Sequence, residues 1–173
     1  LNSALEINNF NTIYLKSLID ILKKMGAKLK VSKNSIKVSK GSKLKSTSLS
    51  TSPYPGFPTD LQAQLMSLMC ISDGKSKIKE TIFENRFMHV PELNRLGANI
   101  TVEKDTATII GNQTFKGAQV MASDLRASIS LVLAAMNANG QTTLNRVYHL
   151  DRGYENIEKT LGSLGAKIKR QKN

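Results

Sequence analysis

Asp60, at the start of a predicted helix, is the first residue of this chain that could carry out chemistry. It follows the Ser-, Thr- and Pro-rich stretch 46–58, which predicts a stiff loop that leads into a helix N-terminus. One interpretation is structural, because a carboxylate interacts favourably with the positive end of the helix dipole. The other is chemical, because a carboxylate held rigidly at the edge of an element can act as a general base.

A second acidic helix start has a closely similar sequence. Asp124 and Arg126 lie in the stretch 123–127, which matches the stretch 59–63 residue for residue at three positions. Ser123 or Asp124 is expected to cap this helix, and Arg126 to pair with a neighbouring carboxylate. Repetition therefore gives both aspartates a structural explanation, and the proline-braced loop keeps the general-base hypothesis open for Asp60.

Two predicted strand-to-helix junctions, at 84–89 and 151–155, concentrate polar groups. Arg86 in the first is a planar, bidentate partner for phosphate or carboxylate. Arg152 in the second stands beside a helix N-terminus, a combination that favours anions. His89 is predicted as a hydrogen-bonded structural histidine in preference to a catalytic one.

Several classes of chemistry are excluded by the motifs. The chain has no Walker loop, dinucleotide-binding glycine motif or nucleophile elbow. One cysteine and two histidines make a zinc cage improbable, and no metal site is expected. The single Cys70 rules out an internal disulfide framework, and its apolar helical register predicts a thiol in the core.

The elements that position these residues recur along the chain. A hydrophobic–Gly–Ala triplet ends a helical pattern at 25–27, 96–98 and 164–166, with spacings of 71 and 68 residues. Each unit is predicted to run helix, strand, strand, strand, helix, strand, and the third is expected to stop after a strand at 166–170. The predicted class is α/β, with mixed sheets around buried helices.

The positive charge is concentrated near the start of the chain. The 173 residues carry a net charge of +12, and residues 1–45 hold ten lysines against two acidic residues. Aromatic residues make up only 5%, so we expect a solvated lysine face and no nucleic-acid partner. No apolar run reaches the roughly 18 residues of a membrane span, so no membrane partner is expected either. No signal peptide is visible, and the first residue, Leu1, indicates a processed or truncated start.

Four long strings carry a family resemblance. They are the stretches 55–64 (PGFPTDLQAQ), 80–93 (ETIFENRFMHVPEL), 122–128 (ASDLRAS) and 148–155 (YHLDRGYE). In this order they resemble the enolpyruvyl transferase family and, within it, the UDP-N-acetylglucosamine 1-carboxyvinyltransferases. The resemblance extends from about Met25 to the end of the chain.

The resemblance implies a two-domain fold of repeated α/β units, an inside-out α/β barrel, with the active site between the domains. It implies that 1–173 form most of one domain, in the C-terminal portion of the enzyme. The implied reaction transfers the enolpyruvyl group of phosphoenolpyruvate to the 3′-hydroxyl of UDP-N-acetylglucosamine and releases phosphate. The resemblance implies that this is the committed step of peptidoglycan synthesis, and that it takes place in the bacterial cytoplasm without metal or organic cofactor.

Residue roles are implied position by position. Asp60 matches the carboxylate that accepts the sugar hydroxyl proton, and Ile82 and Phe83 match the segment that contacts the UDP-sugar. Arg152 matches an arginine that reaches phosphoenolpyruvate as the domains close. The remaining matches, to charged residues around the reacting centre, are Arg86, Asp124 and Arg126.

The family also uses groups that this chain does not contain. They are a lysine–asparagine pair, further arginines and usually a loop cysteine, which Cys70 does not match. We therefore expect this chain to need the missing N-terminal part of the enzyme for turnover. The alternatives are a transferase that acts on shikimate 3-phosphate, and a truncated, non-catalytic module that binds a UDP-sugar or a partner protein.

Overall fold

The predicted order of helices and strands is confirmed in the first two units. The computed structural model describes residues 4–39, 41 and 43–171. An additional strand precedes the first unit, and a 3-10 turn leads into each of its helices. In chain order these elements are β1 (Leu5–Asn8), η1 (Thr12–Leu15), α1 (Lys16–Lys24), β2 (Lys28–Val31), β3 (Ser35–Ser39), β4 (Ser48–Ser50), η2 (Thr59–Leu61), α2 (Gln62–Ile71) and β5 (Lys75–Lys79).

The second unit repeats this order without the extra strand. Its elements are α3 (Val90–Arg95), β6 (Asn99–Glu103), β7 (Thr106–Ile110), β8 (Gln119–Met121), α4 (Leu125–Ala135) and β9 (Thr143–Asn145). Two helices follow, α5 (Tyr148–Asp151) and α6 (Ile157–Ser163).

The sheets are mixed, as expected. Their strand orders are β1-β3-β2, β4-β5-β7-β6 and β8-β9, with parallel pairing for β4–β5 and β8–β9 and antiparallel pairing elsewhere. The register of the first sheet recurs in the second. Val38 lies between Leu29 and Leu5, and Ile109, 71 residues further on, lies between Ile100 and Ser76. The repeat read from the sequence is therefore a repeat of structure.

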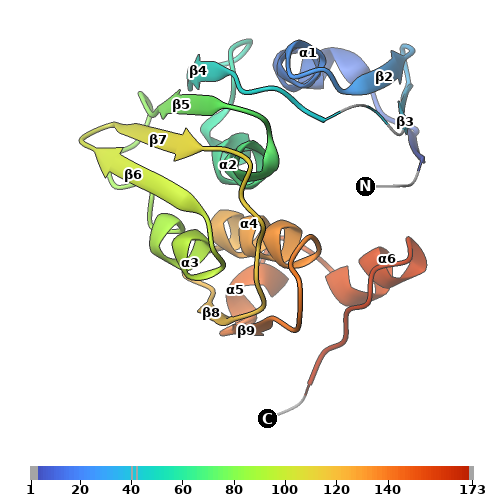
Figure 1. The fold of residues 1–173 in the computed structure, drawn as a ribbon. Helices are drawn as coiled ribbons and strands as arrows, with labels where there is room; N and C mark the ends of the chain where they lie inside the picture. Colours follow the sequence, from blue (N-terminus) through green and yellow to red (C-terminus); the bar gives the residue numbers. More distant parts are fainter. Residues whose placement is uncertain (1–3, 40, 42, 172–173) are drawn as a thin grey trace.

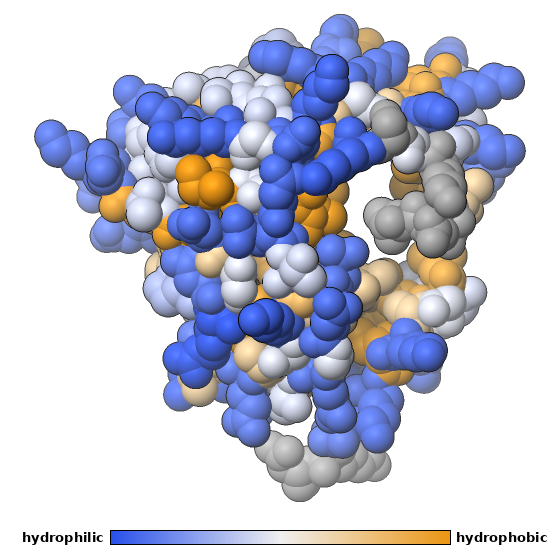
Figure 2. Space-filling view, viewed as in Figure 1, coloured by the Kyte–Doolittle hydropathy of each residue, from blue (hydrophilic) through white to orange (hydrophobic). Residues whose placement is uncertain are grey.

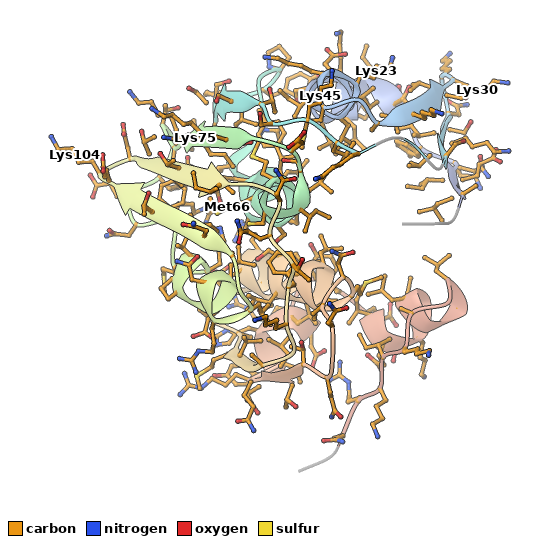
Figure 3. The ribbon with its side chains drawn as sticks, in the orientation of Figure 1. Lys23, Lys30, Lys45, Met66, Lys75 and Lys104 are labelled. Atoms are coloured by element: carbon orange, nitrogen blue, oxygen red, sulfur yellow. The ribbon has the colours of Figure 1, made fainter. Side chains whose placement is uncertain are left out.

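Two apolar helices form the centre of the molecule. Helix α2 lies under the four-stranded sheet, and α4 lies beneath α2 (Figure 1). Met66 on α2 is completely buried, and Figure 3 shows it in the interior. Ser67 Oγ donates a hydrogen bond to the carbonyl oxygen of Ser130 at 2.9 Å, so the two helices approach closely. Apolar residues around the whole helix circumference explain why both helices are buried.

Glycines terminate the helices where the triplets predicted it. Gly26, Gly97 and Gly165 have φ values of +92°, +100° and +94°. This left-handed conformation carries no steric penalty for a residue without a Cβ. The chain can therefore turn sharply from helix to strand in each unit.

The predicted segments 46–58 and 166–170 differ from the structure. Residues 48–50 of the predicted loop 46–58 form β4, because a parallel neighbour, β5, is available to pair with them. Residues 166–170 are not a strand, because the described residues contain no hairpin partner for them such as β3 is for β2. Instead Arg170 bonds Asp151 Oδ1 at 2.6 Å. The extra strand β1 was not predicted.

The predicted lysine face is confirmed for the residues that the structure describes. The lysines between 16 and 45 are exposed, and Lys40 lies outside the described residues. Side chains such as Lys23, Lys30 and Lys104 extend from the outer surface in Figure 3, and hydrophilic atoms cover most of the face in Figure 2. Within the described stretch, no helix is long and apolar enough to cross a bilayer.

An apolar hollow lies between α1 and the first sheet. The hollow has a volume of about 240 Å³. Its lining is made by Ile7, Phe10, Leu15, Leu18, Ile19, Leu22, Leu29, Ile36 and Val38.

We predict that Cys70 resists alkylation while the protein is folded. The side chain is completely buried, and burial raises the pKa of its thiol to about 12. Since the thiolate is the reactive form, iodoacetamide near pH 8 should leave Cys70 unmodified in the native protein. The same reagent should modify it fully in concentrated guanidinium chloride. Peptide mass spectrometry measures both, and rapid native labelling would contradict the prediction.

Candidate active site

Three predicted site residues meet in one cluster of charges. Asp60 Oδ1 accepts hydrogen bonds from Arg86 Nη2 at 3.0 Å and from Arg126 Nε at 2.5 Å. The aspartate side chain is 60% exposed, whereas the arginine side chains are 23% and 35% exposed. The carboxylate is therefore open to a ligand while its charge is compensated from two sides.

The repeat explains why these residues meet. Asp60 lies in η2 at the start of α2, and Arg126 lies in the first turn of the equivalent helix α4. The two helices run side by side in the same direction, since contacts join both their starts and their middles. Arg86 enters from the segment that links β5 to α3. The hollow at this junction is lined by Thr59, Gln62, Ala63, Arg86, His89, Asp124, Arg126 and Ala127.

Asp124 and Asp60 occupy equivalent positions in the repeats but have different structural roles. Asp124 is the N-cap of α4, and its Oδ1 accepts from the backbone N–H groups of Arg126 at 2.8 Å and Ala127 at 3.1 Å. The expected capping role of Asp124 is confirmed. Pro58 occupies the corresponding position before η2, and Asp60 makes no capping bond within the described residues. The carboxylate of Asp60 is thus available for another role.

Arg86 joins the cluster to the predicted UDP-sugar segment. Its guanidinium carbon lies 4.9 Å from the centre of the Phe83 ring, in a cation–π arrangement. Its Nε donates to Thr59 Oγ1 at 3.2 Å. Phe83 is 57% exposed and Ile82 is half-buried. The exposed ring of Phe83 therefore stands next to the charged cluster.

Glu80 was not singled out from the sequence, yet it organises this region. The carboxyl group is buried, with 4% of the residue exposed. It accepts hydrogen bonds from the hydroxyls of Thr51 and Thr59 and from the backbone N–H groups of Ile82 and Phe83. The alternating pattern of β5 was the available signal, because it continues inward at position 80.

His89 lies in the wall of the same hollow and is 3% exposed. Burial lowers the pKa of its imidazole to about 4; the carboxylate of Asp124 raises that pKa and Arg86 lowers it further. The ring is therefore neutral at physiological pH. Its Nε2 has no hydrogen-bond partner among the described residues, so the expected hydrogen bond is not found at that atom.

Arg152 is placed near the cluster but outside it. The predicted strand-to-helix junction at 151–155 is wrong, because Asp151 ends helix α5 and Arg152 is its C-cap residue, so Arg152 does not stand beside a helix N-terminus. Arg152 is exposed, and its side chain forms no hydrogen bond or ion pair within the described residues. The next residue, Gly153, packs against Leu125, which stands between Asp124 and Arg126. Arg152 is therefore on the side of the molecule where α4 begins, but it does not touch Asp60. No group of three or more His, Cys, Asp and Glu side chains that could hold a metal occurs in residues 4–39, 41 and 43–171.

The family assignment follows from the sequence match. Residues 3–161 match the family model of EPSP synthase (3-phosphoshikimate 1-carboxyvinyltransferase). The chain belongs to the EPSP synthase family. The resemblance carried by the four sequence strings is confirmed.

Curated relatives carry a more specific name within this family. The UDP-N-acetylglucosamine 1-carboxyvinyltransferases of Pelagibacter ubique and Azorhizobium caulinodans are 55% and 56% identical over 96% and 90% of this chain. The UDP-N-acetylglucosamine 1-carboxyvinyltransferase 2 of Mesorhizobium japonicum is 52% identical over 96% of it. The chain spans 40%, 37% and 40% of the lengths of these three relatives.

Solved structures confirm the predicted fold class. The enolpyruvyl transferase NikO from Streptomyces tendae superposes with a TM-score of 0.89 at 30% identity, over 97% of this chain and 40% of that one. EPSP synthase from Acinetobacter baumannii superposes with a TM-score of 0.72 at 16% identity, which shows a shared fold. The mixed sheets around buried helices are the enolpyruvyl transferase fold.

We predict that the two equivalent aspartates differ in their effect on stability. Asp124→Ala should lower the free energy of unfolding by about 1 kcal/mol, because two N–H groups of α4 lose their cap. Asp60→Ala should change it by less than about 0.5 kcal/mol, because its ion pairs are exposed and it caps nothing. Urea unfolding of the two variants measures the difference. Equal losses would contradict the assignment of a cap to Asp124 alone.

A pH dependence of stability is predicted from His89. Its folded pKa lies below the ordinary value of 6.5, so the unfolded chain takes up the proton first as the pH falls. The contribution of neutral His89 to the free energy of unfolding is therefore fully present above about pH 6.5 and is lost as the pH falls toward 4. Between about pH 7 and pH 5 the loss amounts to about 2 kcal/mol.

Urea unfolding at the two pH values checks this prediction. In His89→Asn the difference between the two pH values should shrink by that amount. His149→Asn, a change of the other histidine, controls for the removal of an imidazole. An unchanged pH dependence in His89→Asn would contradict the prediction.

Proposed function

We propose that the protein to which this chain belongs transfers the enolpyruvyl group of phosphoenolpyruvate to the 3′-hydroxyl of UDP-N-acetylglucosamine and releases phosphate. The observation that carries the proposal is the Asp60–Arg86–Arg126 cluster, in which the carboxylate is exposed and is not used as a helix cap. The names of the curated relatives support the choice of substrates. In this role the protein acts in the cytoplasm, at the committed step toward peptidoglycan.

Asp60 is the proposed general base. An alcohol becomes a nucleophile when its proton is accepted as the new bond forms, and a carboxylate within hydrogen-bond reach can accept it. Asp60 Oδ1 is held by two guanidinium groups, so its second oxygen can face the sugar hydroxyl. The oxygen–carbon bond to the enolpyruvyl group then forms, and the bond to phosphate breaks.

The arginines are the proposed partners of phosphoenolpyruvate. Each guanidinium has five N–H donors, of which Arg86 uses two and Arg126 one in the hydrogen bonds of the described chain. The remaining donors can bind the carboxylate or phosphate of the substrate bidentately. Arg152 reaches the same substrate when the domains close, since it lies beside the start of α4. Asp124 fixes that start and so the position of Arg126.

Ile82 and Phe83 are the proposed contacts of the UDP-sugar. The half-buried Ile82 and the exposed ring of Phe83 offer an apolar surface next to Asp60, so a sugar bound there would place its hydroxyl at the base. The rest of the cleft is contributed by parts of the enzyme beyond these 173 residues. The chain forms most of one domain in this proposal, and on its own it is not expected to turn over.

The decisive experiment is phosphate release by the intact gene product with phosphoenolpyruvate and UDP-N-acetylglucosamine. We expect Asp60→Asn to lower the rate by about 10²- to 10⁴-fold, because the amide cannot accept the hydroxyl proton. Asp20→Asn is the matched control, since Asp20 is exposed on α1 and its ion pair within the described residues is with Lys16. Replacement of the acceptor by shikimate 3-phosphate should abolish release.

Three outcomes would contradict the proposal. Phosphate release from phosphoenolpyruvate with shikimate 3-phosphate as acceptor, and not with UDP-N-acetylglucosamine, would assign the protein to the other acceptor. Release that survives Asp60→Asn would remove the general base. A folded, intact protein without any release would favour the binding module.

A further inference from the structure

We propose that Glu80 is a positioning residue that couples the general base to the UDP-sugar contact. The proposal rests on the proposed function and adds a residue to it. Glu80 touches neither substrate, but its two carboxylate oxygens bond two separate segments of the candidate site. One segment leads to Asp60 and the other holds Ile82 and Phe83.

The first oxygen acts on the charged cluster through Thr59. Thr59 Oγ1 donates to Glu80 Oε2 at 2.9 Å and accepts from Arg86 Nε at 3.2 Å. A hydroxyl has one proton to give, so the bond to Glu80 fixes its lone pairs toward Arg86. Arg86 in turn holds Asp60 at 3.0 Å. The orientation of Arg86 therefore depends on Glu80.

The second oxygen acts on the sugar-contact segment. Glu80 Oε1 accepts from the backbone N–H of Ile82 at 2.9 Å and of Phe83 at 3.4 Å, and from Thr51 Oγ1 at 2.7 Å. These bonds close a tight turn immediately after β5. They hold the two residues in place, with the Phe83 ring exposed and Ile82 half-buried.

Glu80 is itself fixed by the sheet. Its backbone N–H donates to the carbonyl oxygen of Asp105 at 2.7 Å, in the turn between β6 and β7. The residue directly follows β5 and continues the buried face of that strand. A buried carboxylate with four donors anchors both segments to a rigid element.

The variant Glu80→Gln should alter the contact with Thr59 and keep the contact with the N–H groups of Ile82 and Phe83. The glutamine oxygen must face the N–H groups of Ile82 and Phe83, because an NH₂ group placed there would face two backbone donors. The NH₂ group then faces Thr59, whose hydroxyl has to accept and loses its own acceptor. Glu80→Gln thus keeps the turn and disturbs Arg86, whereas Glu80→Ala disturbs both.

The test is steady-state kinetics of the intact gene product. Glu80→Gln and Thr59→Val should each lower kcat by about tenfold, the size expected for a hydrogen bond linked to a charged group. The KM for UDP-N-acetylglucosamine should stay within about twofold in both. The kcat of the double variant should be no lower than that of either single variant. The conservative Thr59→Ser, which keeps the hydroxyl, should keep the unmodified protein's kcat. Thr47→Val is the control, a buried threonine whose hydroxyl has no partner among the described residues.

Glu80→Ala should also raise the KM for UDP-N-acetylglucosamine by about tenfold or more. Hydrogen exchange at the amides of Ile82 and Phe83 should accelerate in this variant and not in Glu80→Gln. The exchange readout needs no turnover, so it separates a failure of this proposal from a failure of the proposed function. Unchanged exchange in Glu80→Ala, or a Glu80→Gln effect on both kinetic constants, would overturn the coupling. If Glu80→Ala does not fold, the kcat and KM values of Glu80→Gln and Thr59→Val decide whether the coupling exists.

Discussion

The packing of α2 against α4 is the interaction on which the candidate site depends. The helices are equivalent members of two repeats and run in the same direction, so their N-terminal turns lie together. One start brings Asp60 and the other Arg126, and neither residue could meet the other without this contact. Apolar burial of both helices supplies the driving force, because most side chains along them are buried.

The charged cluster around Asp60 is positioned from the end of strand β5, where Glu80 lies. Exposed ion pairs contribute little stability by themselves, and Asp60 is an exposed partner. What holds the arginine beside it is a chain of contacts that ends at a buried glutamate. The hydroxyl of Thr59 and the ring of Phe83 restrict Arg86 from two directions. Precise placement of surface charges is thus achieved by groups beneath them.

Local sequence patterns predicted much of the fold and part of the site. The Gly–Ala triplets predicted two units correctly, and the acid at position 124 predicted a cap, because these signals act within a few residues. The contact between Asp60 and Arg126 spans 66 residues, so no local pattern contains it. Glu80 was missed because its partners come from three segments, although the strand alternation pointed it inward. The strand expected at 166–170 failed because a strand needs a partner as well as a pattern.

The serine contact between the two central helices has a consequence for substitutions far from any charge. Ser67 and Ser130 meet about one and a half helical turns after the first residues of α2 and α4, where small side chains permit the close approach of the backbones. A bulkier residue at either position would widen the separation of the helix axes along their whole length. The ion pair at their N-termini would then lengthen, although no residue that takes part in it had changed. Volume at positions 67 and 130 is therefore expected to be constrained as strictly as charge at the surface.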